Sequence, residues 1–145
     1  MAADRTADVT WSGSLLEGSG RIERVGSGSF GPLDVTWASR TEEPGGRTSP
    51  EELIAAAHAA CFSMAFSNIL AKAGTPPERL ETSATVTFVP GTGITKSALT
   101  VRGTVPGMDE AAFREAAEDA KKNCPVSMAL AALPEITVTA TLEQA

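Results

Sequence analysis

The sequence contains no tyrosine, and aromatic residues make up only 5% of its 145 residues. It has a single histidine, His58, and only two cysteines, Cys61 and Cys124, which lie far apart in the chain. This pattern excludes a disulfide-dense secreted scaffold and a zinc site built from closely spaced ligands. We therefore expect no metal and no organic cofactor, and we expect each cysteine to start as a thiol in a reducing compartment.

Positive charge is also scarce, because 12 lysines and arginines face 18 acidic residues and leave a net charge of −6. This balance opposes binding to nucleic acids. The longest apolar run, Leu53–Phe66, is interrupted by polar residues and is too short to cross a bilayer, so we expect a core helix. The segment Met1–Asp8 lacks the apolar region of a secretory signal. We expect a cytoplasmic protein that binds neither nucleic acid nor membrane.

A chain of this length, with 42% hydrophobic residues, can bury a core within one domain. Hydrophobic periodicity and turn residues predict strands, two of them paired as a hairpin, and helices in the order βββ-α-ββ-αα-β. The expected elements after the central helix are a hairpin of Thr82–Phe88 and Ile94–Val105, helices at Asp109–Asn123 and Pro125–Leu133, and a last strand at Ile136–Leu142. Before it we expect short strands at Val9–Trp11, Arg21–Val25 and Val35–Ala38, the last of them leading to Arg40. The order predicts one α+β domain over residues 1–145.

The central helix has a well-marked start, with Ser49 as N-cap, Pro50 at the first helical position and Glu52 completing a capping box. Gly74 supplies its stop. Residues at three- and four-position intervals predict a stripe that faces the core, formed by Ile54, Ala57, Cys61, Met64, Ala65 and Asn68. We therefore expect Cys61 to be largely sheltered from bulk water.

The two cysteines differ in what their surroundings predict. Cys61 alone is compatible with a small buried hydrophobe as well as with a nucleophile. Pro125 favours the N-cap of a short helix for Cys124, where free backbone N–H groups and the helix dipole would stabilise a thiolate. If the fold brings the two together, they can act as attacking and resolving thiols, but their separation does not establish a contact.

A glutamate, one of three arginines and the histidine are further candidates for a site. Glu51 has no role in the helix cap, and it either interacts with the helix dipole or orients an arginine. Arg40 is the first candidate for that arginine, and Arg47 and Arg21 remain alternatives. His58 precedes Cys61 by one turn and either lowers the thiol pKa or packs as a hydrogen-bonded core residue, the interpretation that we favour.

Two blocks resemble a known family. Thr48–Ser67 reads TSPEELIAAAHAACFSMAFS, and Asn123–Leu130 reads NCPVSMAL. At these residues the chain resembles the OsmC/Ohr family of thiol-dependent peroxidases, in particular its OsmC branch, and each block carries one of the family's two cysteines. The resemblance extends over nearly the whole chain, including Ala7–Gly20 and Gly93–Lys96.

The resemblance implies an intertwined α+β homodimer, in which antiparallel sheets wrap around the Cys-bearing helices and two sites form between subunits. The sequence supports this arrangement independently. Glu51 and Cys61 are ten positions apart on one helix, which corresponds to about 15 Å along its axis. If Glu51 acts at a thiol, the simplest geometry takes it from the partner chain.

The resemblance also implies the chemistry. Cys61 would be the peroxidatic residue and Cys124 the resolving one, while Arg40 and Glu51 complete the site. An organic hydroperoxide would yield an alcohol, a Cys61 sulfenic acid and then a Cys61–Cys124 disulfide, which an external lipoyl-type dithiol reduces. Such a reaction, weaker with hydrogen peroxide, protects against oxidative stress.

Some assignments stay open at this point. An apolar pocket for bulky hydroperoxides is expected from among the side chains Phe62, Met64, Phe66 and Phe30. The main alternative function is a non-catalytic redox-switch or ligand-binding stress dimer. A third reading, an inert relative with structural cysteines, predicts thiols that react slowly with alkylating reagents.

Overall fold

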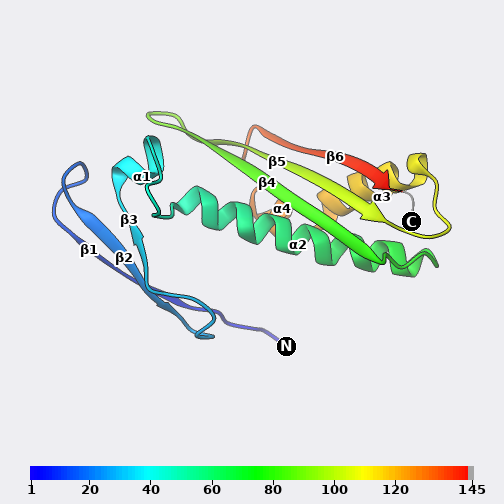
Figure 1. The fold of residues 1–145 in the computed structure, drawn as a ribbon, viewed down its shortest axis with the longest axis horizontal. Coiled ribbons are helices and arrows are strands. Elements are labelled where there is room, and N and C mark those ends of the chain that lie inside the picture. Colours follow the sequence, from blue (N-terminus) through cyan, green and yellow to red (C-terminus); the bar gives the residue numbers. More distant parts are fainter. Residues whose placement is uncertain (144–145) are drawn as a thin grey trace. The chain divides into compact units, whose positions relative to one another are not determined.

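The computed structural model describes residues 1–143 of the chain. They form two compact units, the first spanning Met1–Leu53 and the second beginning at Ile54 (Figure 1). The α+β class expected from the sequence is confirmed. The single domain over residues 1–145 stays a prediction.

The first unit contains a three-stranded antiparallel sheet in the order β1-β2-β3. Its strands are β1 (Ala7–Ser12), β2 (Ser19–Val25) and β3 (Leu33–Val35) (Figure 1). Neighbouring strands are consecutive in the sequence, which makes the sheet a β-meander. Every side chain of β1 is exposed, so this sheet has little core of its own.

A short helix, α1 (Trp37–Thr41), follows β3. The prediction of an extended segment leading to Arg40 was therefore wrong. Thr36 caps this helix, because its hydroxyl accepts from the Ser39 backbone N–H at 3.0 Å, while the Ser39 hydroxyl accepts from the Thr36 N–H at 2.9 Å. This reciprocal cap satisfies two backbone donors and outweighs the strand preference of the valine and tryptophan in the segment.

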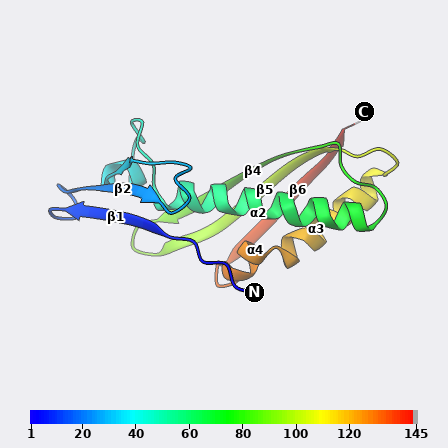
Figure 2. The ribbon, with the colours of Figure 1, turned by 90° about the horizontal axis from the view of Figure 1, so that it is seen from below.

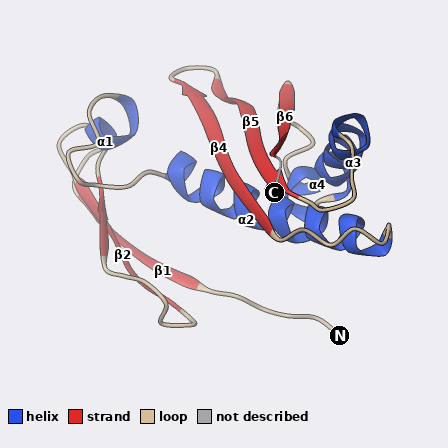
Figure 3. Ribbon diagram, turned by 45° about the vertical axis from the view of Figure 1, so that its right-hand side comes forward, coloured by secondary structure: helices blue, strands red, loops and turns tan. Residues whose placement is uncertain are grey.

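The second unit places helices on one face of a second three-stranded sheet (Figures 2 and 3). The sheet has the order β4-β5-β6, with an antiparallel β4–β5 hairpin and β6 parallel to β5, so the expectation of antiparallel sheets is wrong for this one. Helices α3 and α4 lie between β5 and β6 in the chain, as a parallel connection requires. The bounds are α2 (Pro50–Lys72), β4 (Arg79–Val89), β5 (Gly93–Thr104), α3 (Glu110–Asn123), α4 (Pro125–Ala129) and β6 (Glu135–Glu143).

The core of the second unit lies between this sheet and α2 and α3. Phe66 contacts Phe62 and Phe113 with ring centroids 5.4 and 5.0 Å apart, and all three rings are fully buried. Leu99 and Val101 of β5 complete the centre of the cluster. Tilted aromatic packing of this kind adds to the free energy gained from apolar burial.

The stripe of α2 that faces this core differs from the predicted one. The buried positions recur every four residues, at His58, Phe62, Phe66 and Leu70. Of the predicted stripe, Ala57, Met64 and Asn68 are exposed, and Ile54, Cys61 and Ala65 are half-buried. The prediction was wrong because the helix is apolar around most of its circumference, so the spacing alone does not select one face.

The ends of α2 follow the predicted signals in part, because the Glu52 carboxylate, expected to complete a capping box with Ser49, accepts from the Thr48 hydroxyl at 2.9 Å instead. The Ser49 hydroxyl accepts from the Glu52 backbone N–H at 3.2 Å, and Gly74 adopts a φ of +87° that favours glycine. With 23 residues α2 is long and apolar enough to cross a membrane by length and composition. Its buried side chains pack in the protein, however, so α2 is a core helix, as expected.

Candidate functional site

The two cysteines of the chain lie in contact within the second unit. The thiol of Cys61, on α2, forms a hydrogen bond with the side chain of Cys124, and both cysteines are free. Cys61 is half-buried, whereas Cys124 is fully buried. Two thiols in contact with one another are placed to be oxidised to a disulfide.

Cys124 occupies the N-cap of α4, with an extended backbone and Pro125 at the first helical position, as predicted. The expected interaction of its sulfur with free backbone N–H groups is not what the structure shows. Cys124 makes no side-chain cap bond, and the N–H of Val126 in the first turn of α4 points to the Cys61 sulfur instead. The backbone donor of this helix therefore serves the other cysteine.

The surroundings of Cys61 act on its pKa in both directions. Burial raises the pKa of the Cys61 thiol, and the hydrogen bond with Cys124 raises it further. The Val126 N–H favours the thiolate and lowers the pKa, but the net shift is upward. The net direction disfavours the thiolate, so a positive charge beside the sulfur would make Cys61 a better nucleophile at neutral pH.

His58 is a hydrogen-bonded core residue, which was the favoured interpretation. Its ring is fully buried, with Nδ1 2.6 Å from the Ser97 hydroxyl of β5 and Nε2 2.7 Å from the Ser127 hydroxyl of α4. Burial lowers the pKa of His58. Because both ring nitrogens bond to serines, neither is available to bond to the Cys61 thiol.

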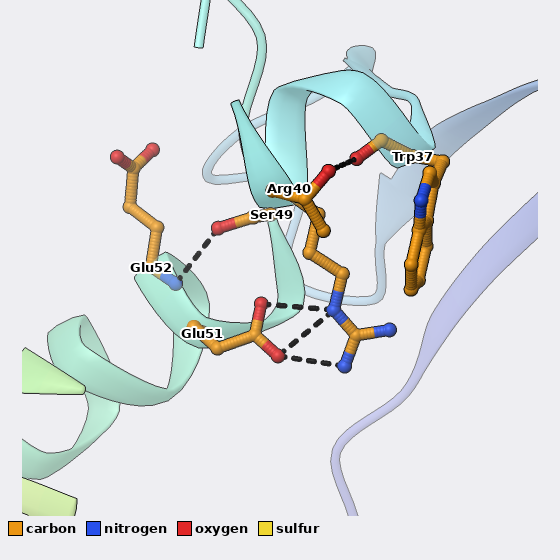
Figure 4. Close-up of polar contacts among 6 residues, drawn as sticks. Trp37, Arg40, Ser49, Glu51 and Glu52 are labelled. Atoms are coloured by element: carbon orange, nitrogen blue, oxygen red, sulfur yellow. Dashed lines mark hydrogen bonds and ion pairs between the residues drawn. The ribbon is translucent and has the colours of Figure 1, made fainter. Parts of the chain in front are cut away.

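A second polar cluster lies in the first unit, where Arg40 pairs with Glu51 (Figure 4). The Nε atom of Arg40 donates to both carboxylate oxygens of Glu51, at 2.9 and 3.1 Å, and Nη2 donates to one of them at 2.6 Å. Glu51 is almost completely buried, and Arg40 is partly exposed. Such a bidentate pair fixes the plane of the guanidinium.

Of the three arginines considered, Arg40 is the one that pairs with Glu51. Arg21 lies 3.9 Å from Asp34, and both of these side chains are exposed. Arg47 is exposed on the loop before α2. Arg40 is therefore the arginine that Glu51 orients, a choice that the sequence left open. Its role in a reaction stays a prediction.

Trp37 is a neighbour of this pair that the sequence reasoning missed. Its ring lies 5.9 Å from the guanidinium carbon of Arg40, within the range of a cation–π contact (Figure 4). The two residues are three positions apart on α1, so they share a helix face. Recognition of the helix signal at Thr36 and Ser39 would have revealed this neighbour.

The side chains expected to line an apolar pocket divide into two groups. Phe62 and Phe66 are fully buried in the core, so they cannot line a site that is open to a substrate. Met64 is 73% exposed and Phe30 is 43% exposed. The expectation is therefore wrong for the first pair.

Comparisons with known proteins agree with these observations. The model of the family described as OsmC-like protein matches residues 43–139. The chain is 40% identical over 141 residues to "Peroxiredoxin OsmC" of Escherichia coli (strain K12), covering 95% of this chain and 96% of that protein.

Solved structures show the same fold. The organic hydroperoxide resistance protein OhrB of Bacillus subtilis has a TM-score of 0.66 and 23% identity, over 95% of this chain and 98% of its own. An OsmC-like protein from Mycoplasma pneumoniae has a TM-score of 0.67 and 18% identity, over 97% and 99%. The family match, the relative's identity and the paired cysteines together show that this chain belongs to the OsmC-like protein family.

Proposed function

We propose that this protein is a two-cysteine peroxidase that reduces organic hydroperoxides to alcohols, and hydrogen peroxide more weakly. The observation that carries the proposal is the hydrogen bond between Cys61 and Cys124, in a chain 40% identical to a peroxiredoxin. Removal of hydroperoxides protects a cell against oxidative stress.

The difference in exposure assigns the two cysteines their parts in this proposal. Cys61 is half-buried, so a hydroperoxide can reach its sulfur, and the Val126 N–H favours its thiolate. Cys124 is fully buried beside it and meets the oxidised Cys61 rather than the substrate. Cys61 is therefore the peroxidatic residue and Cys124 the resolving one.

The reaction has three steps. The Cys61 thiolate attacks one peroxide oxygen, the O–O bond breaks, and the leaving oxygen takes a proton to become the alcohol. Cys124 then attacks the Cys61 sulfenic acid, which forms the disulfide and releases water. An external dithiol, of the lipoyl type by resemblance, supplies the two electrons that restore both thiols.

Arg40 and Glu51 complete the site in our proposal. The upward shift of the Cys61 pKa calls for a positive charge, and a guanidinium would stabilise both the thiolate and the departing oxygen. Glu51 holds that guanidinium in place through the bidentate pair. Because Glu51 and Cys61 are ten positions apart on one helix, or about 15 Å, we assign the pair to the Cys61 of a second copy.

A homodimer is the assembly that fits the exposed apolar side chains. Ala57, Ala60 and Met64 are exposed on α2 close to Cys61 in the helical repeat. Small residues allow close approach of a second helix, and apolar surface of this kind marks an interface. In the first unit Val9 and Trp11 are exposed on β1 as well. An intertwined dimer would cover both regions.

The same apolar surroundings of Cys61 favour organic hydroperoxides over hydrogen peroxide as substrates. Met64, three positions after Cys61, is the side chain that we expect a bulky substrate to contact. The two free thiols agree with a reducing compartment, and we propose the cytoplasm as the location.

The direct test is peroxide consumption by the reduced protein with cumene hydroperoxide and dihydrolipoamide as the dithiol. We expect turnover by the wild type, no turnover by Cys61→Ser, and a single oxidation without further turnover by Cys124→Ser. Hydrogen peroxide is the comparison substrate.

A wild type that consumes no peroxide, yet forms the Cys61–Cys124 bridge, would contradict the peroxidase and favour a redox switch. A wild type whose thiols also resist alkylation at neutral pH would favour an inert relative.

A further inference from the structure

A second side-chain contact, between His58 and Ser127, lies beside the contact between the two cysteines. His58 lies three positions before Cys61 on α2, and Ser127 lies three positions after Cys124 on α4. The pairs Cys61–Cys124 and His58–Ser127 are therefore two adjacent connections between the same two helices. Neither the family match nor the peroxidase chemistry gives a role to the second connection.

Helix α4 is short, and the hydrogen bond to His58 adds to the apolar packing of Cys124 and Val126 that holds it. It has only five residues, so its own backbone hydrogen bonds hold it weakly. Its first two residues, Pro125 and Val126, are exposed and half-buried, and Met128 is 63% exposed. Ser127 is the buried residue within the helix, and its hydroxyl lies 2.7 Å from the His58 ring.

The His58 ring is itself held firmly. It is fully buried on α2, and its other nitrogen lies 2.6 Å from the Ser97 hydroxyl on β5. A buried polar network whose members are all satisfied fixes distances more strictly than apolar packing does. The ring thus ties α4 to α2 and β5 through two hydrogen bonds.

We propose that His58 is a positioning residue for the resolving step, acting through its hydrogen bond to Ser127. This bond holds α4 so that Cys124 reaches the Cys61 sulfenic acid before a second hydroperoxide does. The inference rests on the proposed peroxidase function. It adds that His58 helps to protect Cys61 from overoxidation.

Two reactions compete for the sulfenic acid. In the first, the Cys124 sulfur bonds to the Cys61 sulfur and one water leaves. In the second, another hydroperoxide transfers an oxygen to the Cys61 sulfur, which yields a sulfinic acid and an alcohol. Displacement of α4 slows the first reaction and leaves the second unchanged.

The structure offers a matched pair of variants, because each serine forms one hydrogen bond with the same buried ring. Ser127→Ala removes the connection to α4, and Ser97→Ala removes only the connection to β5. Loss of one such bond corresponds to about a fivefold change in rate. We expect Ser127→Ala to slow disulfide formation by at least that factor, and Ser97→Ala to slow it less.

The measurement is quenched-flow mass spectrometry after mixing the reduced protein with cumene hydroperoxide. It separates the rate of Cys61 oxidation, which we expect within about twofold of wild type in both variants, from the rate of disulfide formation. Ser127→Ala is expected to accumulate sulfenic and then sulfinic acid at lower peroxide concentration. Ser127→Thr keeps the hydroxyl and should restore resolution.

Disulfide formation driven by diamide provides a second readout that needs no peroxide. If the wild type consumed no peroxide, the proposed function would fail, but the order of the diamide rates would still test the positioning role. Equal disulfide rates in Ser127→Ala and the wild type would overturn the inference. Equal slowing in both alanine variants would also overturn it, because a general loss of stability would then explain the effect.

Discussion

The second unit buries eleven side chains in one cluster, whereas Ile22 is the buried hydrophobic core residue of the first unit among those that the structure describes. The cysteine pair lies in the well-packed unit, and the Arg40–Glu51 pair lies in the poorly packed one. The difference indicates that the thiols are positioned by the chain's own core. By contrast, the unit that holds the ion pair needs apolar cover from elsewhere, which in our proposal is a second copy.

The largest effect is expected from a charge on the exposed face of α2. Met64→Glu would bury an unpaired carboxylate against the second copy, which costs several kcal/mol, or about a hundredfold or more in the dimer dissociation constant. Light scattering after size-exclusion chromatography measures the change. Thr100→Glu, at an exposed position of β5 whose side chain points away from the core, is the control and should remain dimeric. A monomeric wild type would refute the proposal that a second copy covers the first unit.

Truncation of an aromatic side chain should cost more free energy of unfolding in the second unit than in the first. We expect Phe66→Ala, in the buried cluster, to lower the free energy of unfolding by about 3–5 kcal/mol. Phe30→Ala, at a 43% exposed position of the first unit, should cost less than about 1 kcal/mol. Urea unfolding followed by circular dichroism measures both. Equal costs would mean that the first unit has a core of its own.

Loss of the Arg40 charge should affect both the reaction and the fold, because it leaves the buried Glu51 carboxylate without its cationic partner. We expect Arg40→Gln to lower kcat/KM for cumene hydroperoxide about a hundredfold. The pH midpoint of Cys61 alkylation by iodoacetamide should also rise, because less positive charge stabilises the thiolate. Arg47→Gln, at an exposed neighbouring position, is the control and should behave as the wild type does. An unchanged alkylation profile in Arg40→Gln would place the pair outside the site.

The smallest effect is a dependence of stability on pH that comes from the only histidine. Burial lowers the pKa of His58 in the folded chain, while the unfolded chain binds a proton near pH 6.5. The unfolded state therefore binds more protons below that pH, and stability falls as the pH drops through and below 6.5. Urea unfolding at several pH values should show this slope in the wild type and a reduced slope in His58→Gln. The same slope in both proteins would assign it to other groups.

Much of this fold could be predicted from the sequence because its signals are local. Ser49, Pro50 and Gly74 delimit α2, and Pro125 places Cys124 at the N-cap of α4. These signals act through backbone donors and allowed dihedral angles within a few residues. Helix α1 also had a local signal, at Thr36 and Ser39, but β-branched and aromatic neighbours obscured it.

The buried face of α2 could not be predicted in the same way. A helix with apolar residues on most sides has no preferred face until its neighbours are known, so the tertiary packing of Phe62 and Phe66 decides it. The partners of His58 come from β5 and α4, which lie 39 and 69 positions away in the sequence. No local sequence pattern predicts contacts between residues so far apart in the chain.

The most direct test of the proposed chemistry is the reaction of the cysteine pair with one equivalent of cumene hydroperoxide in the absence of any reductant. Mass spectrometry of the protein and chromatography of the products count the Cys61–Cys124 disulfide and the alcohol. We predict one alcohol per disulfide in the wild type, and one alcohol with a Cys61 sulfenic acid in Cys124→Ser. Unconsumed hydroperoxide with both thiols still free would contradict the account.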